Sequence, residues 1–282
     1  MIRLCVFGPP TISREGRGSL DDICRQTKRF ALLVYLACED CEGAHRRDRL
    51  LAMFWPEADE TRGRNALRQS LYFLRNALGS EVINGNGSEE LQVNRNSLSS
   101  DLNSFLKALG EDDPERALAL YRGDFLSGFH LSGSPDFESW VEDQRHCLRG
   151  MAANLARDLA HRAEGSRDLP NAIHWWRKSL DLAPFDEKAL RRLMSLLAGS
   201  GNRGQAMSEF LHFRREASNQ LGATLSQETM DLARKISEGQ QAFDLEWILD
   251  RRQGDRCSTP RFAGVKRAGD LNGISSGVVD LE

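Results

Sequence analysis

The strongest constraint on the fold is a leucine stripe between residues 61 and 80. Leu67, Leu71, Leu74 and Leu78 recur at intervals of four and three, so at 100° per residue they lie on one side of a helix. The opposite side carries Thr61, Asn65, Arg68, Gln69, Tyr72 and Arg75. These twenty residues contain no Asp or Glu, so we expect no acidic partner for their arginines along the helix. The segment predicts an amphipathic helix with an apolar side in a core and a basic side exposed.

The polar side of this helix allows two interpretations. Arginine can bind guanine or a phosphate, Asn and Gln can pair with adenine, and Tyr can donate to a phosphate, so this set of residues suits a helix in the major groove of DNA. A solvated surface helix would show the same amphipathic pattern. The surrounding elements therefore decide between the two.

Those elements have the order of a winged helix. The sequence predicts short strands over residues 2–7 and 11–13, and then a helix for which Thr27 is the N-cap. A second helix is expected over about residues 46–54, closed by Trp55-Pro56, and the third begins near Asp59. Short β-like runs over 81–84 and 90–94 then predict a hairpin. Residues 1–100 are thus expected to form a winged helix-turn-helix domain, in which the third helix enters the major groove.

This arrangement selects two groups of candidate DNA-binding residues. The candidates for the recognition helix are Arg64, Asn65, Arg68, Gln69, Tyr72 and Arg75. Phosphate contacts are expected from basic or polar residues at helix starts and after the hairpin, where they would clamp the backbone: Lys28, Arg29, Arg46, Arg47, Thr61, Arg62 and Arg95. Each of these residues alone can equally be an ordinary solvated side chain.

The second part of the chain has the pattern of helical repeats. Ala172 and Trp176 recur 34 residues later as Ala206 and Phe210, and Pro184 lies twelve residues after Ala172, as in tetratricopeptide repeats. Trp140, Trp175, Trp176 and Phe210 are expected in the core between stacked helices, with a peptide-binding groove as the alternative. We expect an all-α tetratricopeptide-like domain over 101–238 and a disordered tail over 239–282. The predicted fold class is mainly α with small β elements.

Charge and cysteine content narrow the possible functions. The net charge is −3 and the pI about 6.1, so affinity for DNA has to come from the placement of a few arginines. The longest apolar run, residues 30–38, is too short to span a bilayer, and no signal peptide is recognisable. We expect a cytoplasmic protein without membrane contact. Cys38, Cys41 and His45, with Cys24, form only a weak metal-ligand pattern, and we predict no metal and no cofactor.

The sequence also resembles a known family. Residues 49–79, RLLAMFWPEADETRGRNALRQSLYFLRNALG, resemble the winged-helix segment of the SARP family of bacterial regulators, whose DNA-binding half is of the OmpR type. Residues 121–126, 140–148 and 206–222 resemble that family's bacterial transcriptional activator domain. The resemblance implies a transcription factor, usually an activator, that binds promoter DNA through the third helix and contacts RNA polymerase. Members typically bind direct repeats as pairs of protomers. The hairpin over 84–90 departs from the family because it is acidic and has no arginine, and Arg95 can take that role.

Two other classes of protein remain as alternatives. A protein-interaction adaptor would use the repeats for partners and the winged helix only for packing, which the acidic hairpin and the negative net charge favour. An enzyme has little support, because the chain contains no GxxxxGK[ST], GxSxG or HExxH motif. We therefore predict a non-enzymatic regulator.

Overall fold

The computed structural model describes residues 1–16, 18–39, 44–86 and 89–239. Within this part, strand β1 (Ile2–Cys5) lies between β2 (Thr11–Arg14) and β7 (Leu98–Ser100) in a sheet of order β3-β2-β1-β7, with β3 at Gly18–Ser19. The predicted N-terminal sheet is confirmed. Strand β7, which pairs parallel with β1, was not predicted, because the three residues Leu-Ser-Ser are too short for a recognisable alternation.

The winged helix is confirmed in its order of elements. A short helix α1 (Asp21–Cys24) precedes α2 (Thr27–Cys38), and β4 (His45–Arg46), α3 (Arg47–Phe54) and α4 (Glu60–Leu78) follow. Strands β5 (Ile83–Asn86) and β6 (Glu90–Val93) form the wing hairpin, and β4 adds to it in the order β4-β6-β5. The prediction that Thr27 is an N-cap is wrong: Gln26 holds that position without a side-chain cap, and Thr27 is already helical.

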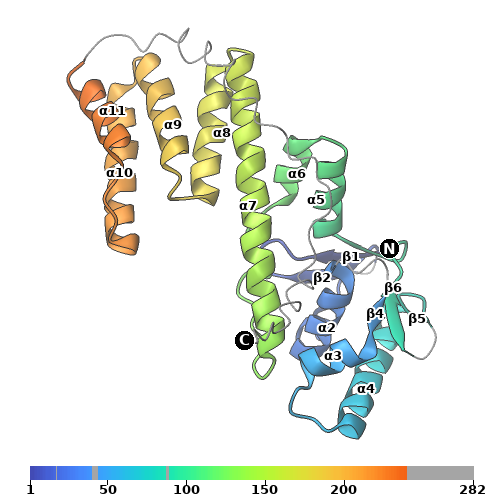
Figure 1. Ribbon diagram of the computed structural model, residues 1–282. Helices are drawn as coiled ribbons and strands as arrows, with labels where there is room; N and C mark the ends of the chain where they lie inside the picture. The colour runs from blue at the N-terminus through green and yellow to red at the C-terminus, as the bar shows by residue number, and fades with distance from the viewer. Residues whose placement is uncertain (17, 40–43, 87–88, 240–282) are drawn as a thin grey trace, which may run out of the picture. The chain divides into compact units, whose positions relative to one another are not determined.

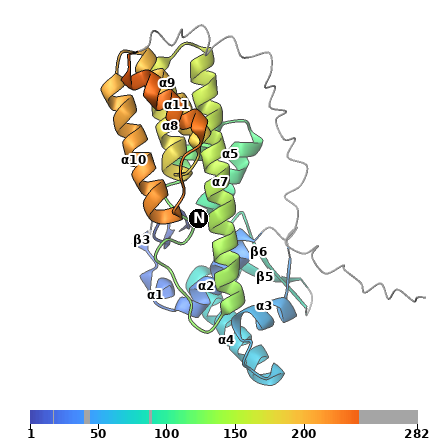
Figure 2. The same ribbon diagram turned by 60° about the vertical axis from the view of Figure 1, so that its left-hand side comes forward.

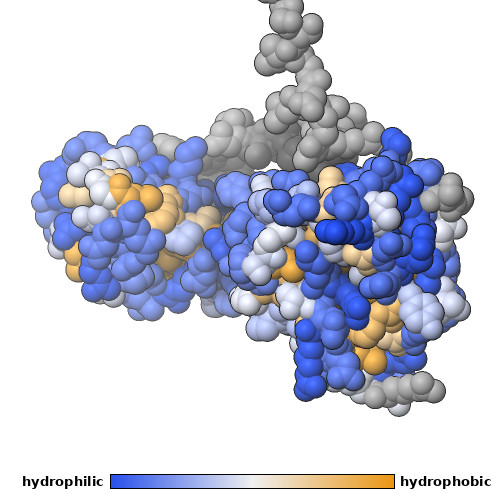
Figure 3. Space-filling model, turned by 90° about the horizontal axis from the view of Figure 1, so that it is seen from below, coloured by the Kyte–Doolittle hydropathy of each residue, from blue (hydrophilic) through white to orange (hydrophobic). Residues whose placement is uncertain are grey.

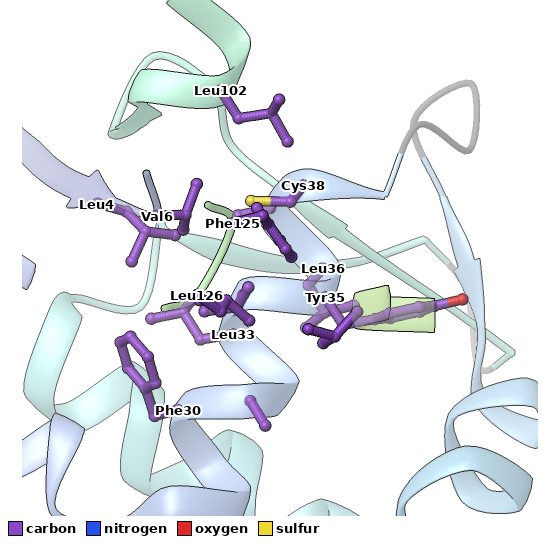
Figure 4. Packing of buried hydrophobic residues seen from close by; sticks show 14 of the residues in the cluster. Leu4, Val6, Phe30, Leu33, Tyr35, Leu36, Cys38, Leu102, Phe125 and Leu126 are labelled. Carbon is purple, nitrogen blue, oxygen red and sulfur yellow. The ribbon is translucent and has the colours of Figure 1, made fainter. Parts of the chain in front are cut away.

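Helix α2 is the centre of the first core. Every residue from Phe30 to Cys38 is buried, because the sheet, α4 and the later helices cover it on all sides. Figure 4 shows Leu33 of α2 beside Leu126, and Cys38 of α2 beside Phe125, where Phe125 and Leu126 belong to a later loop. The leucine stripe of α4 is confirmed: its side chains are at most 3% exposed at positions 67, 71, 74 and 78.

The segment after β7 completes this core. Helix α5 (Asp101–Gly110) begins with Asp101, whose carboxylate accepts hydrogen bonds from the backbone N–H groups of Val6 (2.8 Å) and Phe7 (3.2 Å). Helix α6 (Pro114–Leu120) follows, and the loop after it forms a β-bridge from Phe125 to Phe7. Arg145 donates to the carbonyl oxygens of Phe125 and Leu126, each at 2.8 Å. The contacts of Asp101 and Phe125 join the segment that follows β7 to the β-sheet.

The remaining helices have the repeat architecture. Helices α7 (Pro135–Gly165), α8 (Leu169–Leu182), α9 (Glu187–Gly199), α10 (Arg203–Leu221) and α11 (Gln227–Ser237) follow one another in antiparallel order (Figures 1 and 2). A stripe of alanines on α7, including Ala152, Ala156 and Ala160, is fully buried or nearly so, which lets α8 pack closely. Trp176 and Phe210, the equivalent positions of the two repeats, are 2% and 3% exposed. The predicted mainly α, tetratricopeptide-like fold is confirmed.

Trp140 corrects one expectation. It does not lie between repeat helices. Its ring packs on Tyr35 of α2 at 4.9 Å between centroids and on Phe125 and Phe137 at 5.5 Å each. Its Nε1 donates to Glu39 at 2.6 Å. Trp175, which was grouped with it, is only half-buried on α8. The first half of α7 therefore belongs to the winged-helix core. No sequence pattern indicates this, because α7 runs without a break.

The division into domains at residue 100 stays a prediction. The buried apolar cluster runs from Ile2 through α5, α6 and α7 to Leu182. The predicted disordered tail lies outside the described residues from position 240 onward. In the described part of the chain, none of the helices combines the length and apolarity that crossing a membrane requires.

The cysteines near α2 do not form a described metal site. Cys38 is buried and burial raises the pKa of its thiol, while Cys41 lies outside the described residues. Across the residues that the structure describes, no group of three or more His, Cys, Asp or Glu side chains is placed to hold a metal. His45 is instead a core residue, with Nε2 at 3.2 Å from the carbonyl oxygen of Leu36.

The buried His45 predicts a loss of stability in acid. Burial lowers the pKa of its imidazole from 6.5, and the Nδ1 atom is buried without a partner. The imidazole of His45 therefore binds a proton more readily in the unfolded chain than in the folded one. The free energy of unfolding should keep its full value above about pH 6.5 and fall as the pH drops below it. Urea unfolding at about pH 5 and about pH 7.5 should show a smaller difference in His45→Gln than in the wild type. His174→Gln, at an exposed histidine, is the control, and an unchanged difference in His45→Gln would refute the prediction.

Candidate nucleic-acid interface

Helix α4 packs against the rest of the domain on one side only. It packs on α2, α3 and β5, and Figures 1 and 2 show its other side uncovered by any described helix or strand. Asp59 caps its N-terminus through Oδ1, which accepts from the N–H of Arg62 at 2.8 Å. The leucine stripe fixes the rotation of the helix, so the polar side has to face outward.

The predicted base-reading residues lie on this outward side. Arg64, Asn65, Arg68, Gln69 and Tyr72 are exposed, and Tyr72 is 69% exposed. Among the described residues, the side chains of Gln69 and Tyr72 have no hydrogen-bond partner. Arg68 makes one long contact, from Nη1 to Asn65 Oδ1 at 3.3 Å. The donors and acceptors of this surface are therefore available to a ligand.

The expectation that the arginines of α4 have no acidic partners is wrong for two of them. Arg64 pairs with Glu60 at 2.7 Å and Arg62 with Asp59 at 3.2 Å. The acid-free stretch begins at Thr61, whereas the helix and its cap begin one and two residues earlier. Exposed pairs of this kind contribute little, about 0–1 kcal/mol, so a phosphate can compete for either arginine.

Arg75 has a structural contact besides its predicted role. It is half-buried, and its Nε donates to the carbonyl oxygen of Ile83 in β5 at 2.9 Å. This hydrogen bond ties the C-terminal half of α4 to the wing. The predicted role of Arg75 in reading a base stays a prediction, and it would rest on the two terminal nitrogens of the guanidinium.

At one edge of the exposed side of α4, Arg47 lies within electrostatic reach of Arg68 and Arg75. Arg47, the first residue of α3, has a buried Nε without a hydrogen-bond partner. Burial and the positive charge of Arg75 hold the pKa of Arg47 below its usual range, Glu89 of the wing raises it, and Arg68 lowers it further. Positive charges close to one another repel and raise the free energy of the site. An anion bound beside them would reduce this repulsion. This clustering is not visible in the sequence, because Arg47 and Arg75 are 28 residues apart.

The opposite edge carries Arg29. Its guanidinium lies over the ring of Phe73 at 4.4 Å from the centroid. Arg29, Arg68, Gln69, Tyr72 and Phe73 line a recess of about 440 Å³. Phe73 was not among the predicted site residues, because it lies between the leucine stripe and the polar face. Arg47 and Arg29 thus flank the exposed side of α4 at its two edges.

Lys28 is placed differently from the prediction. Its Nζ donates to the carbonyl oxygen of Phe54 at 2.8 Å and lies 5.7 Å from the ring centroid of Trp55. The ammonium group therefore caps the C-terminus of α3, where a positive charge is favourable. A phosphate contact from Lys28 would require breaking this hydrogen bond.

The other predicted phosphate residues divide by position. Thr61 and Arg62 are exposed in the first turn of α4, and Arg46 is exposed at the N-cap of α3. Arg95 follows β6 at the end away from the hairpin turn, and it lines a recess of about 20 Å³ with Glu39 and His45. It is therefore not placed to replace a basic side chain at the tip of the wing.

Comparisons with known proteins identify the second half of the chain. Residues 103–237 match the bacterial transcriptional activator domain family. The fold is similar to that of Mycobacterium tuberculosis EmbR in complex with a low affinity phosphopeptide, with a TM-score of 0.60 and 18% identity over 89% of this chain and 68% of that chain. No curated protein matches. At this identity the likeness to EmbR is one of fold. The chain therefore carries a bacterial transcriptional activator domain over residues 103–237, preceded by a winged helix.

Proposed function

We propose that the protein binds duplex DNA in a sequence-specific manner, with α4 in the major groove. Asn65, Arg68 and Gln69 would read base edges, and Arg47 and Arg29 would contact the phosphates on the two sides of the groove. The observation that carries the proposal is the exposed side of α4, where the hydrogen-bonding groups of Arg68, Gln69 and Tyr72 are available near the buried, partnerless Nε of Arg47. Exposed Arg46, Thr61 and Arg62 would add phosphate contacts.

The winged-helix domain is nearly neutral, so its net charge contributes little to DNA affinity. Residues 1–100 carry 14 basic and 13 acidic side chains, so the domain has no general attraction for a polyanion. Glu89 is exposed beside the arginine cluster. A few placed arginines must therefore supply most of the binding, which favours specific over indiscriminate contact.

The activator domain suggests the further partners. By analogy with SARP-type regulators, we propose that residues 103–237 contact RNA polymerase at promoters and that two protomers bind direct repeats as a homodimer. Such a regulator acts in the cytoplasm and has no enzymatic step. Activation itself is inferred from the family and not from any residue.

The direct test is to capture genomic DNA fragments with the purified protein and to sequence them. Sequence-specific binding predicts a common motif, and paired protomers predict two copies in the same orientation at fixed spacing. Fragments without a shared motif would contradict specific recognition. The adaptor alternative, in which the winged helix only packs, predicts no retention of DNA at low salt.

The salt dependence of binding should identify the phosphate contacts. The logarithm of the association constant should fall linearly with the logarithm of salt concentration, with a slope of about −0.9 for each neutralised phosphate. Arg47→Ala should make this slope shallower by about one unit. Lys28→Ala is the matched control, because its ammonium group is occupied by Phe54 and the slope should not change. Equal slopes in all three proteins would exclude Arg47 as a phosphate contact.

A further inference from the structure

The recess beside α4 contains apolar as well as polar surface, so it is more than a site for polar contacts. Its wall includes the rings of Tyr72 and Phe73, and its polar residues are Arg29, Arg68 and Gln69. Figure 3, which views the protein from below, shows a largely hydrophilic surface with several apolar patches. An exposed tyrosine without a described hydrogen-bond partner leaves apolar surface in water, which favours an apolar ligand group.

The flanking charges restrict which ligand fits. Arg29 is fixed across Phe73 at 4.4 Å, and Arg68 lies on the other side of Tyr72 in the helix. A ligand that matches this recess would place an apolar group against the rings and a negative charge near the arginines. In the major groove, the C5-methyl group of thymine is the apolar group that lies among base edges and phosphates.

We propose that this recess takes the methyl-bearing edge of a thymine, so that Tyr72 and Phe73 make the site selective for A·T pairs. The inference rests on the proposed binding of DNA through α4. Gln69 precedes Tyr72 by three residues, and side chains at this spacing are about 5–6 Å apart at Cβ. Gln69 can therefore pair with adenine N6 and N7 while Tyr72 packs on the methyl group of the same or the next base pair.

The recess is open to solvent and has room for this ligand. At about 440 Å³ it is far larger than a methyl group and admits the edge of a pyrimidine ring. Arg29 also lines the recess, so its guanidinium is available to a backbone phosphate next to the bound base. The recess thus combines a phosphate contact with an apolar base contact, which a simple phosphate clamp does not require.

The test compares thymine with uracil, which lacks only the methyl group. A pool of duplexes with a randomised centre is selected on the full-length protein, and the selected duplex is then remade with uracil at one thymine position at a time. At the position read by Tyr72, uracil should weaken binding about fourfold, the effect of one buried methyl group. Equal binding of thymine and uracil at every position would overturn the inference and leave DNA binding intact. Failure of the pool to yield any bound duplex would instead overturn the proposed function.

Variants connect the effect to the recess. In Tyr72→Ala the ratio of thymine to uracil affinity should fall to about one, whereas Tyr72→Phe keeps the ring and should keep the ratio. Arg46→Ala is the matched control, because it removes an exposed charge outside the recess and should weaken both duplexes equally. If Tyr72→Ala lowers affinity and the ratio persists, Tyr72 does not contact the methyl group.

Discussion

Trp140→Ala is expected to lower the free energy of unfolding by about 3–5 kcal/mol, the usual cost of truncating a buried tryptophan. The indole is 9% exposed and packs on three aromatic rings, those of Tyr35, Phe125 and Phe137. Its loss also removes the hydrogen bond from Nε1 to Glu39. Urea unfolding followed by circular dichroism measures the change.

Two variants separate the causes of this loss. Trp140→Phe keeps an aromatic ring and removes the indole donor, and the carboxylate of Glu39 retains Arg49 at 3.1 Å, so a cost of about 1–2 kcal/mol is expected. Trp175→Ala is the control for removing a tryptophan, since that ring is half-buried and should cost less. An equal loss of unfolding free energy in Trp140→Ala and Trp175→Ala would show that the contact of Trp140 with α2 adds no stability beyond that of a half-buried tryptophan.

The position of Trp140 has a consequence for how the two parts of the chain work together. Phe137 and Trp140 of α7 are buried against the winged helix, while Ala152 and Ala156 of the same helix are buried against α8. One continuous helix therefore contributes to both cores. A change that shifts α7 at the repeats must also strain its packing on α2, so the two parts are mechanically linked within the described residues.

Helices and strands could be predicted where a single local sequence pattern determines the structure. The stripe from Leu67 to Leu78 gave the rotation of α4, and Trp55-Pro56 gave the end of α3, because apolar periodicity and proline chemistry act within a few residues. The repeat positions Trp176 and Phe210 were predictable for the same reason. The wing hairpin was correct in kind, with its first strand displaced by two residues.

The contacts that shape the interface were not predictable, because they join residues far apart in the chain. Nothing near Lys28 indicates that Phe54 will accept its ammonium group, and nothing near Arg29 indicates the ring of Phe73. The residues selected by helical spacing lie on the outward side as expected, but which of them are already engaged depends on tertiary packing. Arg75 illustrates this, because its hydrogen bond goes to Ile83.

Arg68→Ala is expected to weaken specific DNA binding by about 1–3 kcal/mol, or roughly 5- to 150-fold, if its guanidinium pairs with a base. The residue is exposed at the edge of α4 that faces Arg47, lines the recess, and adds its charge to that around Arg47. Electrophoretic mobility shifts with a selected duplex and a scrambled one measure the loss, which should appear mainly for the selected duplex.

Two further variants distinguish readout from charge. Arg68→Lys keeps the positive charge without the planar fork of donors, so nonspecific binding should persist while the preference for the selected duplex falls. Arg64→Ala removes an arginine from the same helix that is already paired with Glu60, and should cost less than Arg68→Ala. Unchanged binding in Arg68→Ala would remove this residue from sequence readout and transfer that role to Asn65 and Gln69.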